Sequence, residues 1–531
     1  MKNSSSSSPS SSSSSPSTSL VIGLSKALLI SGVIFFIGIV LIPNIRNCPA
    51  DYATEVVSKS DSATKGTLSS VSLLSPNSNH LGSSSAPQED DDDPNAPTTL
   101  KHLMFGMVGS EAAWHHRKPY VESWWRPNHT RGYLFLDVNP TGDLLPWSPL
   151  SPPYKISENI TRVVQETGHV DARVARMVHG IRETVRAAGD NKGVRWVVMG
   201  DDDTIFMVDN LVQVVAGYDH TKYYYIGGQS EFVLSNFWFS FNQAFGGAGF
   251  VLSYPLAKAM SDGIMDCLKR YSYLTSADKT TMSCVADLGV NISPHRGFHQ
   301  LDMRGDISGF LSYHPNVPLM SLHHFDMADP IFPFVDRAEA ARRIMKSAQL
   351  DQSRVMQQVI CYHRPLNWSF SLSWGYSAQI YERRMPRSYL QNPIETFLTW
   401  GEASNPPFWM FDVRPRSGDP CEAPHFFFLR TAKLKKRQKL IAPRSGNNNH
   451  HNNNNDDEIL TTYFRSWKRG LGPCSATTPN RSADQISRIQ VISPATTRFQ
   501  NDRSECCNVV RVSRTRASIK LRRCKVDEVI A

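Results

Sequence analysis

The 531-residue chain is predicted to contain an α/β domain, with a parallel-rich sheet covered by helices on both faces. From about residue 100, short apolar runs rich in β-branched and aromatic residues alternate with segments of helical spacing. Two of these runs end on acids, at Asp137 and at Asp201-Asp202-Asp203. In an open α/β sheet, ligands bind beyond the carboxyl ends of the strands. The acids are therefore expected at the mouth of a site.

The predicted elements follow one another closely in this region. Strands are expected at 103–108, 133–137, 196–199 and 223–226. Helices are expected at 114–125, at 174–185 before Gly189, at 208–216 with Asp209 near the cap, and from Pro255 towards Cys267. Strands that alternate with helices in this way favour a parallel-rich sheet.

Composition argues against two classes of partner. The formal net charge is +9, but the basic residues crowd the C-terminal part, as in 433–437 and 511–523. No RNA- or DNA-binding motif accompanies them, so a solvated surface is expected and no nucleic-acid partner. The nine cysteines form no C-x-x-C pattern, which argues against zinc.

The N-terminal region predicts a membrane anchor. Residues 1–19 form a Ser/Pro-rich tail that is expected to be disordered and cytosolic. Residues 20–42 are apolar apart from Lys26 and are long enough to cross a bilayer. Lys2 and Lys26 precede the apolar core, and this charge bias favours a cytosolic N-terminus. We therefore expect an uncleaved signal anchor and a single-pass type II protein, bound to the membrane through this one helix.

Everything after the anchor is then expected to be lumenal. Residues 43–99 are rich in Ser, Asn and Asp and predict a flexible stem. Five triplets match the N-glycosylation acceptor pattern, which is consistent with a lumenal location; they begin at Asn128, Asn159, Asn291, Asn367 and Asn480.

The acid triplet and a glycine-rich segment are the first candidate site features. Three adjacent carboxylates repel one another unless a cation lies between them, and oxygen ligands suit Mg²⁺ or Mn²⁺. The alternative is a solvated acidic turn. The segment 245–250, Phe-Gly-Gly-Ala-Gly-Phe, permits close backbone approach to a ligand or forms a strained turn.

Four motifs in one order carry a family resemblance. They are Gly-Asp-Asp-Asp-Thr at 200–204, Phe-Gly-Gly-Ala-Gly-Phe at 245–250, an acid at 278 and Leu-His-His-Phe-Asp at 322–326. This set resembles the Fringe-related, β1,3-type glycosyltransferases, and most closely their plant branch described as a domain of unknown function. The resemblance covers residues 100–333. It implies a GT-A-type fold with a Rossmann-like mixed sheet that binds a UDP-sugar, a D-x-D metal site and inversion at the anomeric carbon.

The resemblance also implies roles for individual residues. Mn²⁺ or Mg²⁺ is expected on Asp203 and Asp201, completed by His324, with His323 the adjacent candidate. Asp278 is the expected catalytic base, although relatives have paired acids where this chain has Ala277. The expected donor-binding residues are Arg117, Asp137, Asp201, Asp202, Gly247 and Gly249.

One metal site and one separate acid favour sugar transfer over hydrolysis. A divalent metal neutralises charge on the leaving diphosphate, and one general base accepts the acceptor proton, whereas glycoside hydrolysis needs two facing carboxylates. We therefore predict a metal-dependent inverting glycosyltransferase that moves a sugar from a UDP-sugar to a hydroxyl of a glycan or glycoprotein, in the Golgi or another secretory membrane. The alternatives are an inactive carbohydrate-binding or scaffolding homologue, which Ala277 favours, and a metal-dependent phosphoesterase.

The remaining sequence, 334–531, predicts a C-terminal extension. Residues 338–358 are expected to be helical, and a low-complexity loop lies near 445–457. Strands at 490–492 and 509–512 around Cys506 and Cys507 predict a small, disulfide-rich unit. In the preceding domain, Cys267 and Cys284 flank the segment that carries Asp278, and in an oxidising compartment we expect them to form a disulfide.

Overall fold

The computed structural model describes residues 96–189, 193–314, 317–435, 457–466, 469–474, 482–498 and 503–530. The predicted tail (1–19), membrane anchor (20–42), nearly all of the stem (43–99) and most of the 445–457 loop lie outside these residues. Within the described ranges, no helix is both long and apolar enough to cross a bilayer.

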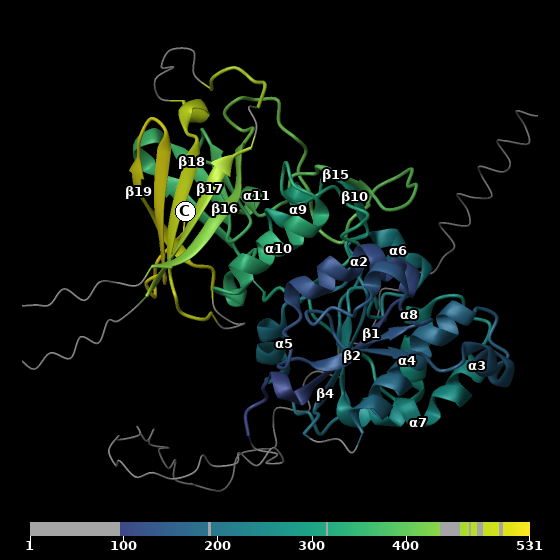
Figure 1. The fold of residues 1–531 in the computed structure, drawn as a ribbon. Coiled ribbons are helices and arrows are strands. Elements are labelled where there is room, and N and C mark those ends of the chain that lie inside the picture. Colours follow the sequence, from purple (N-terminus) through teal and green to yellow (C-terminus); the bar gives the residue numbers. More distant parts are fainter. Residues whose placement is uncertain are drawn as a thin grey trace, which may run out of the picture. The chain divides into compact units, whose positions relative to one another are not determined.

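A mixed seven-stranded sheet forms the centre of the N-terminal part (Figure 1). Strands β3, β2, β1 and β4 are parallel, β7 runs antiparallel to both β4 and β6, and β8 is parallel to β6. This arrangement confirms the expected mixed α/β sheet. In sheet order, the strands are β3 (Tyr154–Ile156), β2 (Arg131–Leu136), β1 (Leu103–Val108), β4 (Trp196–Asp201), β7 (Phe250–Ser253), β6 (Tyr225–Gly227) and β8 (Ile292–Pro294).

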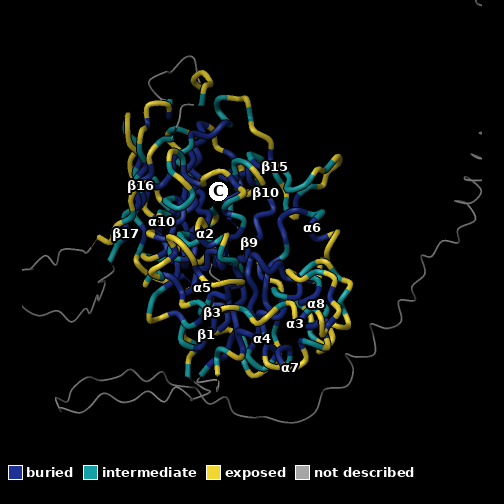
Figure 2. Tube along the Cα trace, turned by 45° about the vertical axis from the view of Figure 1, so that its right-hand side comes forward, coloured by how far each residue is buried: buried dark blue, intermediate teal, exposed yellow. Residues whose placement is uncertain are grey.

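Helices cover both faces of this sheet because the central strands are apolar on both sides. In β4, Trp196 and Val198 join one hydrophobic core, and Val197 and Met199 join a second. The first core includes residues of α2 (Glu111–Trp124) and α5 (Val208–Val215). The second includes residues of α3 (Ile160–Thr167), α4 (Ala172–Ala188), α7 (Tyr254–Arg270) and α8 (Ala277–Asp287). Figure 2 shows a buried interior with exposed segments around α3, α7 and α8.

The helix ends follow the capping signals in most places. The side chains of Ser110, Asp171 and Ser276 accept hydrogen bonds from the first turns of α2, α4 and α8. Helix α5 differs slightly from expectation, because Met207 is its N-cap and Asp209 lies in the first turn. The predicted Cys267–Cys284 disulfide is confirmed, and it joins α7 to α8.

Two small sheets connect distant parts of the chain. The first contains β5 (Ile205–Phe206), β11 (Ser321–Leu322) and β9 (Phe298–His299), in the order β5-β11-β9. The second pairs β10 (Met303–Gly305) with β15 (Phe397–Thr399), so part of the predicted extension lies against the N-terminal domain. Between these elements lie the short helices α6 (Val233–Trp238) and α9 (Ser308–Leu311).

The C-terminal part is larger and more regular than predicted. Helix α10 (Arg337–Ala348) ends ten residues before the expected boundary, because the chain turns and enters a strand at Gln358. An eight-stranded sheet follows instead of a small unit, and α11 (Arg387–Leu390) lies within this region. In sheet order, the strands are β12 (Gln358–His363), β13 (Trp368–Ser373), β14 (Ser377–Tyr381), β16 (His425–Lys435), β17 (Glu458–Arg465), β18 (Arg488–Pro494), β20 (Arg516–Arg522) and β19 (Cys506–Val512).

Disulfides hold this second sheet together. A bond between Cys361 of β12 and Cys507 of β19 joins the first and last strands of the sheet order. Two further bonds, Cys421–Cys474 and Cys506–Cys524, lie in the same region. The expectation of a disulfide-rich extension is therefore confirmed, although its size is not.

Candidate active site

The acid triplet lies where β4 leaves the sheet, at the edge formed by the carboxyl ends of the parallel strands. A tight turn fixes it: the N–H of Asp201 donates to the hydroxyl of Thr204 (2.9 Å), and the N–H of Thr204 donates to the carbonyl of Asp201 (3.2 Å). Asp202 and Asp203 are buried, whereas Asp201 is partly exposed. The turn therefore holds two carboxylates inside the protein, where they require compensation.

Arg117 of α2 supplies part of that compensation. Its Nη1 donates to Oδ1 of Asp202 (2.6 Å), and its Nη2 donates to Oδ2 of Asp326 (2.9 Å). The same Nη2 lies 3.3 Å from Oδ2 of Asp203. Arg117 was expected to bind the donor. In the structure it contacts three carboxylates, and its role towards a donor stays a prediction.

His323 reaches the acids through strand pairing. Leu322 of β11 lies opposite Ile205 of the antiparallel β5, so the residue after β11 meets the residues before β5. The Nε2 atom of His323 lies 3.1 Å from Oδ1 of Asp203 and 3.7 Å from Oδ2 of Asp201. A three-stranded sheet thus joins two motifs that are more than a hundred residues apart.

Burial and charge shift the protonation of this group. Burial raises the pKa of Asp201 to about 7. Burial would also raise the pKa of Asp203, but the charges of His323 and Arg117 hold that pKa well below its usual range. Burial lowers the pKa of His323, but the carboxylates of Asp203 and then Asp201 raise it to about 9. The contact between His323 and Asp203 is therefore an ion pair at neutral pH.

Asp201, Asp203 and His323 fit a divalent cation. One ligand atom from each lies within 4.8 Å of the others. Neither oxygen of the buried Asp203 is aligned for a hydrogen bond. The carboxylates of the triplet and of Asp326 outnumber the two cationic side chains that contact them. A set dominated by carboxylates suits Mg²⁺ or Mn²⁺, and His323 would have to lose its proton to ligate the ion.

His324 points elsewhere. Its Nδ1 lies 3.1 Å from Oδ1 of Asp302, and its ring stacks on Trp400 at 4.2 Å and 12°. The backbone of His324 is left-handed, with φ of 49°. The sequence placed His324 first and His323 second as the metal-ligating histidine; the structure brings His323 to the acids and directs His324 towards Asp302.

The glycine-rich segment lies directly against the acid triplet. The hydroxyl of Thr204 donates to the carbonyl of Gly247 (2.8 Å), and the N–H of Ala248 donates to Oε1 of Gln300 (2.8 Å). A Cβ at Gly247 would lie 2.1 Å from Cε1 of His323. At Gly249, φ is +82° and a Cβ would lie 2.6 Å from the ring of Phe206. Glycine is therefore required at 247 and 249 by close approach, and their contact with a donor stays a prediction.

Asp278 and Asp201 line the same cleft. This cleft also contacts Gly246, Phe250 and Ala277. The N–H of Gly246 donates to Oδ1 of Asp278 (2.8 Å), which fixes that carboxyl in the first turn of α8. Burial raises the pKa of Asp278 to about 6, although the bond from Gly246 opposes this shift. The structure thus brings the expected base to the expected metal site, with Ala277 beside it.

Asp137 lies at the same edge of the sheet, directly after β2. Its Oδ1 accepts a hydrogen bond from the N–H of Glu111 (2.8 Å), at the start of α2. The N–H of Ser110 donates to Oδ2 of Asp202 (3.1 Å). The start of α2 therefore connects two of the carboxylates that were expected to bind the donor.

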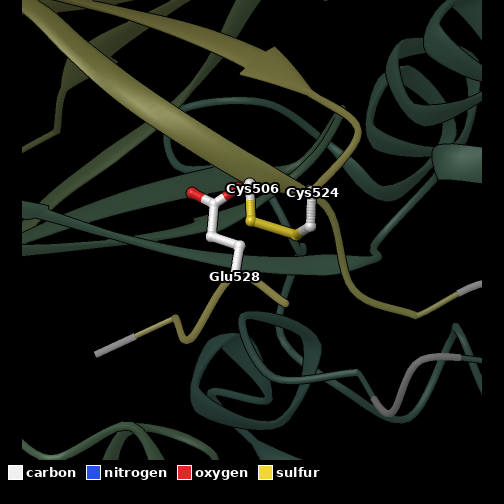
Figure 3. A group of neighbouring side chains, drawn as sticks. All are labelled: Cys506, Cys524 and Glu528. Carbon is white, nitrogen blue, oxygen red and sulfur yellow. A yellow bond between two sulfur atoms is a disulfide. The ribbon is translucent and has the colours of Figure 1, made fainter. Parts of the chain in front are cut away.

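A group of potential ligands at Cys506, Cys524 and Glu528 does not fit a metal. Figure 3 shows the two sulfur atoms joined in a disulfide, so neither is a thiolate. The carboxylate of Glu528 pairs with Arg522 at 2.6 Å. This group is a disulfide and a neighbouring ion pair that stabilise the end of the described chain.

A second group, Glu382, His425 and Asp484, is also satisfied without a cation. Nε2 of His425 lies 2.7 Å from Oε1 of Glu382, and Arg465 donates to the other ring nitrogen at 2.7 Å. Nη2 of Arg469 lies 3.3 Å from Glu382 and 3.5 Å from Asp484. Two guanidinium groups already neutralise the acids, and they would repel a metal.

Sequence reasoning missed three residues of the site, namely Asp302, Asp326 and Trp400. Asp326 belongs to the Leu-His-His-Phe-Asp motif, so its place in that motif was an available signal. Trp400 directly follows β15, in the segment assigned to the extension, and no local pattern connects it with His324.

Comparisons with known families agree with this geometry. Residues 100–328 match the family described as Fringe-like. Residues 235–507, which are more than half of the chain, match the family described as protein of unknown function, DUF604. No curated protein matches the chain significantly.

Proposed function

This chain belongs to the DUF604 family and carries a Fringe-like glycosyltransferase-type domain, and we propose that it is a metal-dependent inverting glycosyltransferase. The observation that carries the proposal is the meeting of Asp201, Asp203 and His323 beside the cleft that contains Asp278. A cation site and a separate acid are the two groups that sugar transfer from a nucleotide requires.

In this proposal, Asp201, Asp203 and His323 hold Mn²⁺ or Mg²⁺. When bound, the ion would supply positive charge to the diphosphate of a UDP-sugar. Arg117 holds Asp202 and Asp326 in place and limits the repulsion among the acids. The glycine-rich segment leaves room for His323, and the start of α2 fixes Asp137 and Asp202.

Asp278 accepts the proton of the acceptor hydroxyl. The acceptor oxygen forms a bond to the anomeric carbon, the bond from that carbon to the diphosphate oxygen breaks, and UDP leaves with the electron pair. A pKa of about 6 suits this role, since the carboxylate is ionised at neutral pH and still basic enough to accept a proton. The acceptor is a hydroxyl of a glycan or glycoprotein.

We also propose a secretory-pathway membrane, such as the Golgi, with the folded domain lumenal. The disulfides of the described region support an oxidising compartment. All four described asparagines of the glycosylation triplets are exposed: Asn128, Asn159, Asn291 and Asn367. The type II orientation and the anchor at 20–42 remain part of this proposal.

The test is UDP release by the purified full-length chain from several UDP-sugars, with and without Mn²⁺. Metal-dependent release supports the enzyme. A second candidate is an inactive carbohydrate-binding or scaffolding homologue, which Ala277 in the cleft favours. Binding of UDP without release from any donor would favour that second candidate, and release of phosphate would favour a phosphoesterase.

A further inference from the structure

Four aromatic side chains around the end of α6 face solvent. Phe237, Trp238, Phe239 and Phe241 have exposed fractions of 70%, 51%, 39% and 43%. We call these four residues the aromatic surface. Single exposed apolar side chains are ordinary, whereas four within five residues mark this segment as a candidate binding surface.

The aromatic surface is held in place from beneath. The buried Asn236 donates from Nδ2 to the carbonyls of Ser230 (2.8 Å) and Phe232 (3.0 Å). The ring of Phe232 is fully buried and contacts the ring of Trp238 edge-on, at 6.1 Å. The side chain of Gln229 donates to the carbonyl of Phe241 (2.7 Å). The aromatic rings are thus presented by a fixed backbone, which lowers the entropy cost of binding.

A ring contact links the aromatic surface to the segment that borders the candidate active site. The rings of Phe239 and Phe245 contact each other at 6.4 Å. Phe245 immediately precedes Gly246, which donates its N–H to Asp278. A ligand that covers Phe239 therefore lies next to the segment that positions the expected base.

A second connection runs through the C-terminal part of the chain. A Cβ at Gly401 would lie 3.5 Å from the ring of Trp238, and the preceding Trp400 stacks on His324. In Figures 1 and 2, α6 lies beside β10 and β15, the pair of strands that brings this segment in. The aromatic surface is thus linked to the site through Phe245 and through the segment of Trp400 and Gly401.

The chemistry of the aromatic surface fits a neutral sugar chain. Between residues 229 and 244 the only ionisable side chain is Glu231, which is buried against His299 at 2.8 Å. No lysine or arginine in this segment is present to attract a phosphate, a sulfate or an anionic lipid. The negative faces of aromatic rings attract the weakly positive C–H faces of sugar rings. Ser240 and the exposed Asn242 add neutral hydrogen-bonding groups.

We propose that the aromatic surface binds the acceptor, as a neutral oligosaccharide whose rings stack on Trp238 and Phe237. The end of that chain then lies towards Asp278. This inference rests on the proposed function and adds the class of acceptor and the residues that recognise it.

The test uses the full-length chain in detergent and measures binding of cellohexaose, xylohexaose and mannohexaose by calorimetry, with hexagalacturonate as the acidic comparison. Trp238→Ala is the main variant and Phe237→Ala the second. Tyr273→Ala is the matched control, because Tyr273 is 66% exposed in the turn after α7. At least one neutral oligosaccharide should bind, with affinity about tenfold weaker in Trp238→Ala and unchanged in Tyr273→Ala. Thermal melting checks that each variant is folded.

Several outcomes would overturn the inference. One is that the parent chain binds none of the three neutral oligosaccharides. Another is that Trp238→Ala and Phe237→Ala bind them with the affinity of the parent chain. A third is that the parent chain prefers hexagalacturonate. A variant effect limited to self-association or to flotation with phosphatidylcholine vesicles would assign the aromatic surface to a second copy or to a membrane. UDP affinity with Mn²⁺ is measured in parallel and should not change. Loss of UDP binding by the parent itself would contradict the proposed function, independently of the sugar result.

Discussion

The Nε2 atom of His323 lies 3.1 Å from the Oδ1 atom of Asp203. The contact depends on the pairing of β11 with β5, which places the residue after β11 beside the residues that precede β5. It also depends on Gly247, since a side chain there would occupy the space of the imidazole. This one relationship therefore draws on three of the sequence motifs, and it underlies the first two predictions.

Asp203→Asn should weaken Mn²⁺-dependent UDP binding by at least roughly tenfold. The amide keeps the shape of the side chain but loses the charge that holds a hard cation. Calorimetry with UDP and Mn²⁺ is the measurement. His323→Gln should have the same effect, and Asp209→Asn is the control, because Asp209 forms an exposed ion pair with Arg126. Parent affinity in both Asp203→Asn and His323→Gln would remove this pair from the metal site.

Two neighbouring glycines should separate the two halves of the site. In Gly247→Ala the new Cβ lies 2.1 Å from the His323 ring, so metal-dependent UDP affinity should fall. In Gly246→Ala the new Cβ lies 2.7 Å from Oδ1 of Asp278, so turnover should fall while UDP affinity changes little. Gly263→Ala is the matched control, since nothing lies within 4 Å of its added Cβ. Equal effects of the two substitutions on binding and turnover would contradict this separation.

Asp278→Asn should lower turnover by about 10²–10⁴-fold, the range typical for loss of a general base. Donor and metal affinity should stay near the parent value, since Asp278 acts on the acceptor proton. Single-turnover kinetics and UDP calorimetry on the same preparation measure the two effects. Turnover at the parent rate would place the base elsewhere, and a collapse of UDP affinity would assign Asp278 to the donor site.

The pH dependence of turnover should report the same carboxyl. Burial raises the pKa of Asp278 to about 6, so its fraction ionised falls as the pH drops below that value. The kcat/KM for the acceptor should therefore decrease about tenfold per pH unit below 6. The residual activity of Asp278→Asn should not show this decrease at low pH. The same decrease in the variant would mean that the titration of another group causes it.

The disulfides should stabilise the two parts of the chain unequally. Cys267–Cys284 closes a separation of 17 residues, and Cys361–Cys507 closes one of 146. Chain entropy predicts losses of about 3 and about 5 kcal/mol when each pair is replaced by serine. Denaturant unfolding of the two double variants is the measurement. A larger loss for the Cys267/Cys284 pair would show that loop length does not govern their contributions.

Much of the fold was readable from the sequence because the central strands are short, apolar and bounded by polar residues. The strand at 103–108 and the start of the Trp196 strand were predicted at their observed positions. The Cys267–Cys284 disulfide was predicted because an oxidising compartment was expected and the two cysteines flank the segment that carries Asp278. The boundary at 358 was wrong, since the helical pattern of 338–348 continues into residues that the tertiary structure turns into a 3-10 helix and a strand. Strand β7 was missed because the glycine-rich segment before it reads as a turn.

The parts of the site that local chemistry controls could be predicted from the sequence. The sequence placed the acids at the end of a strand, glycines at 247 and 249, and two adjacent histidines after a short strand. Tertiary structure alone decided which histidine faces the acids, because the register of β11 on β5 directs His323 to Asp203 and leaves His324 on Asp302 and Trp400. The partner of a side chain depends on strand register and on the backbone angles of its own residue, and His324 differs from His323 in having a left-handed backbone.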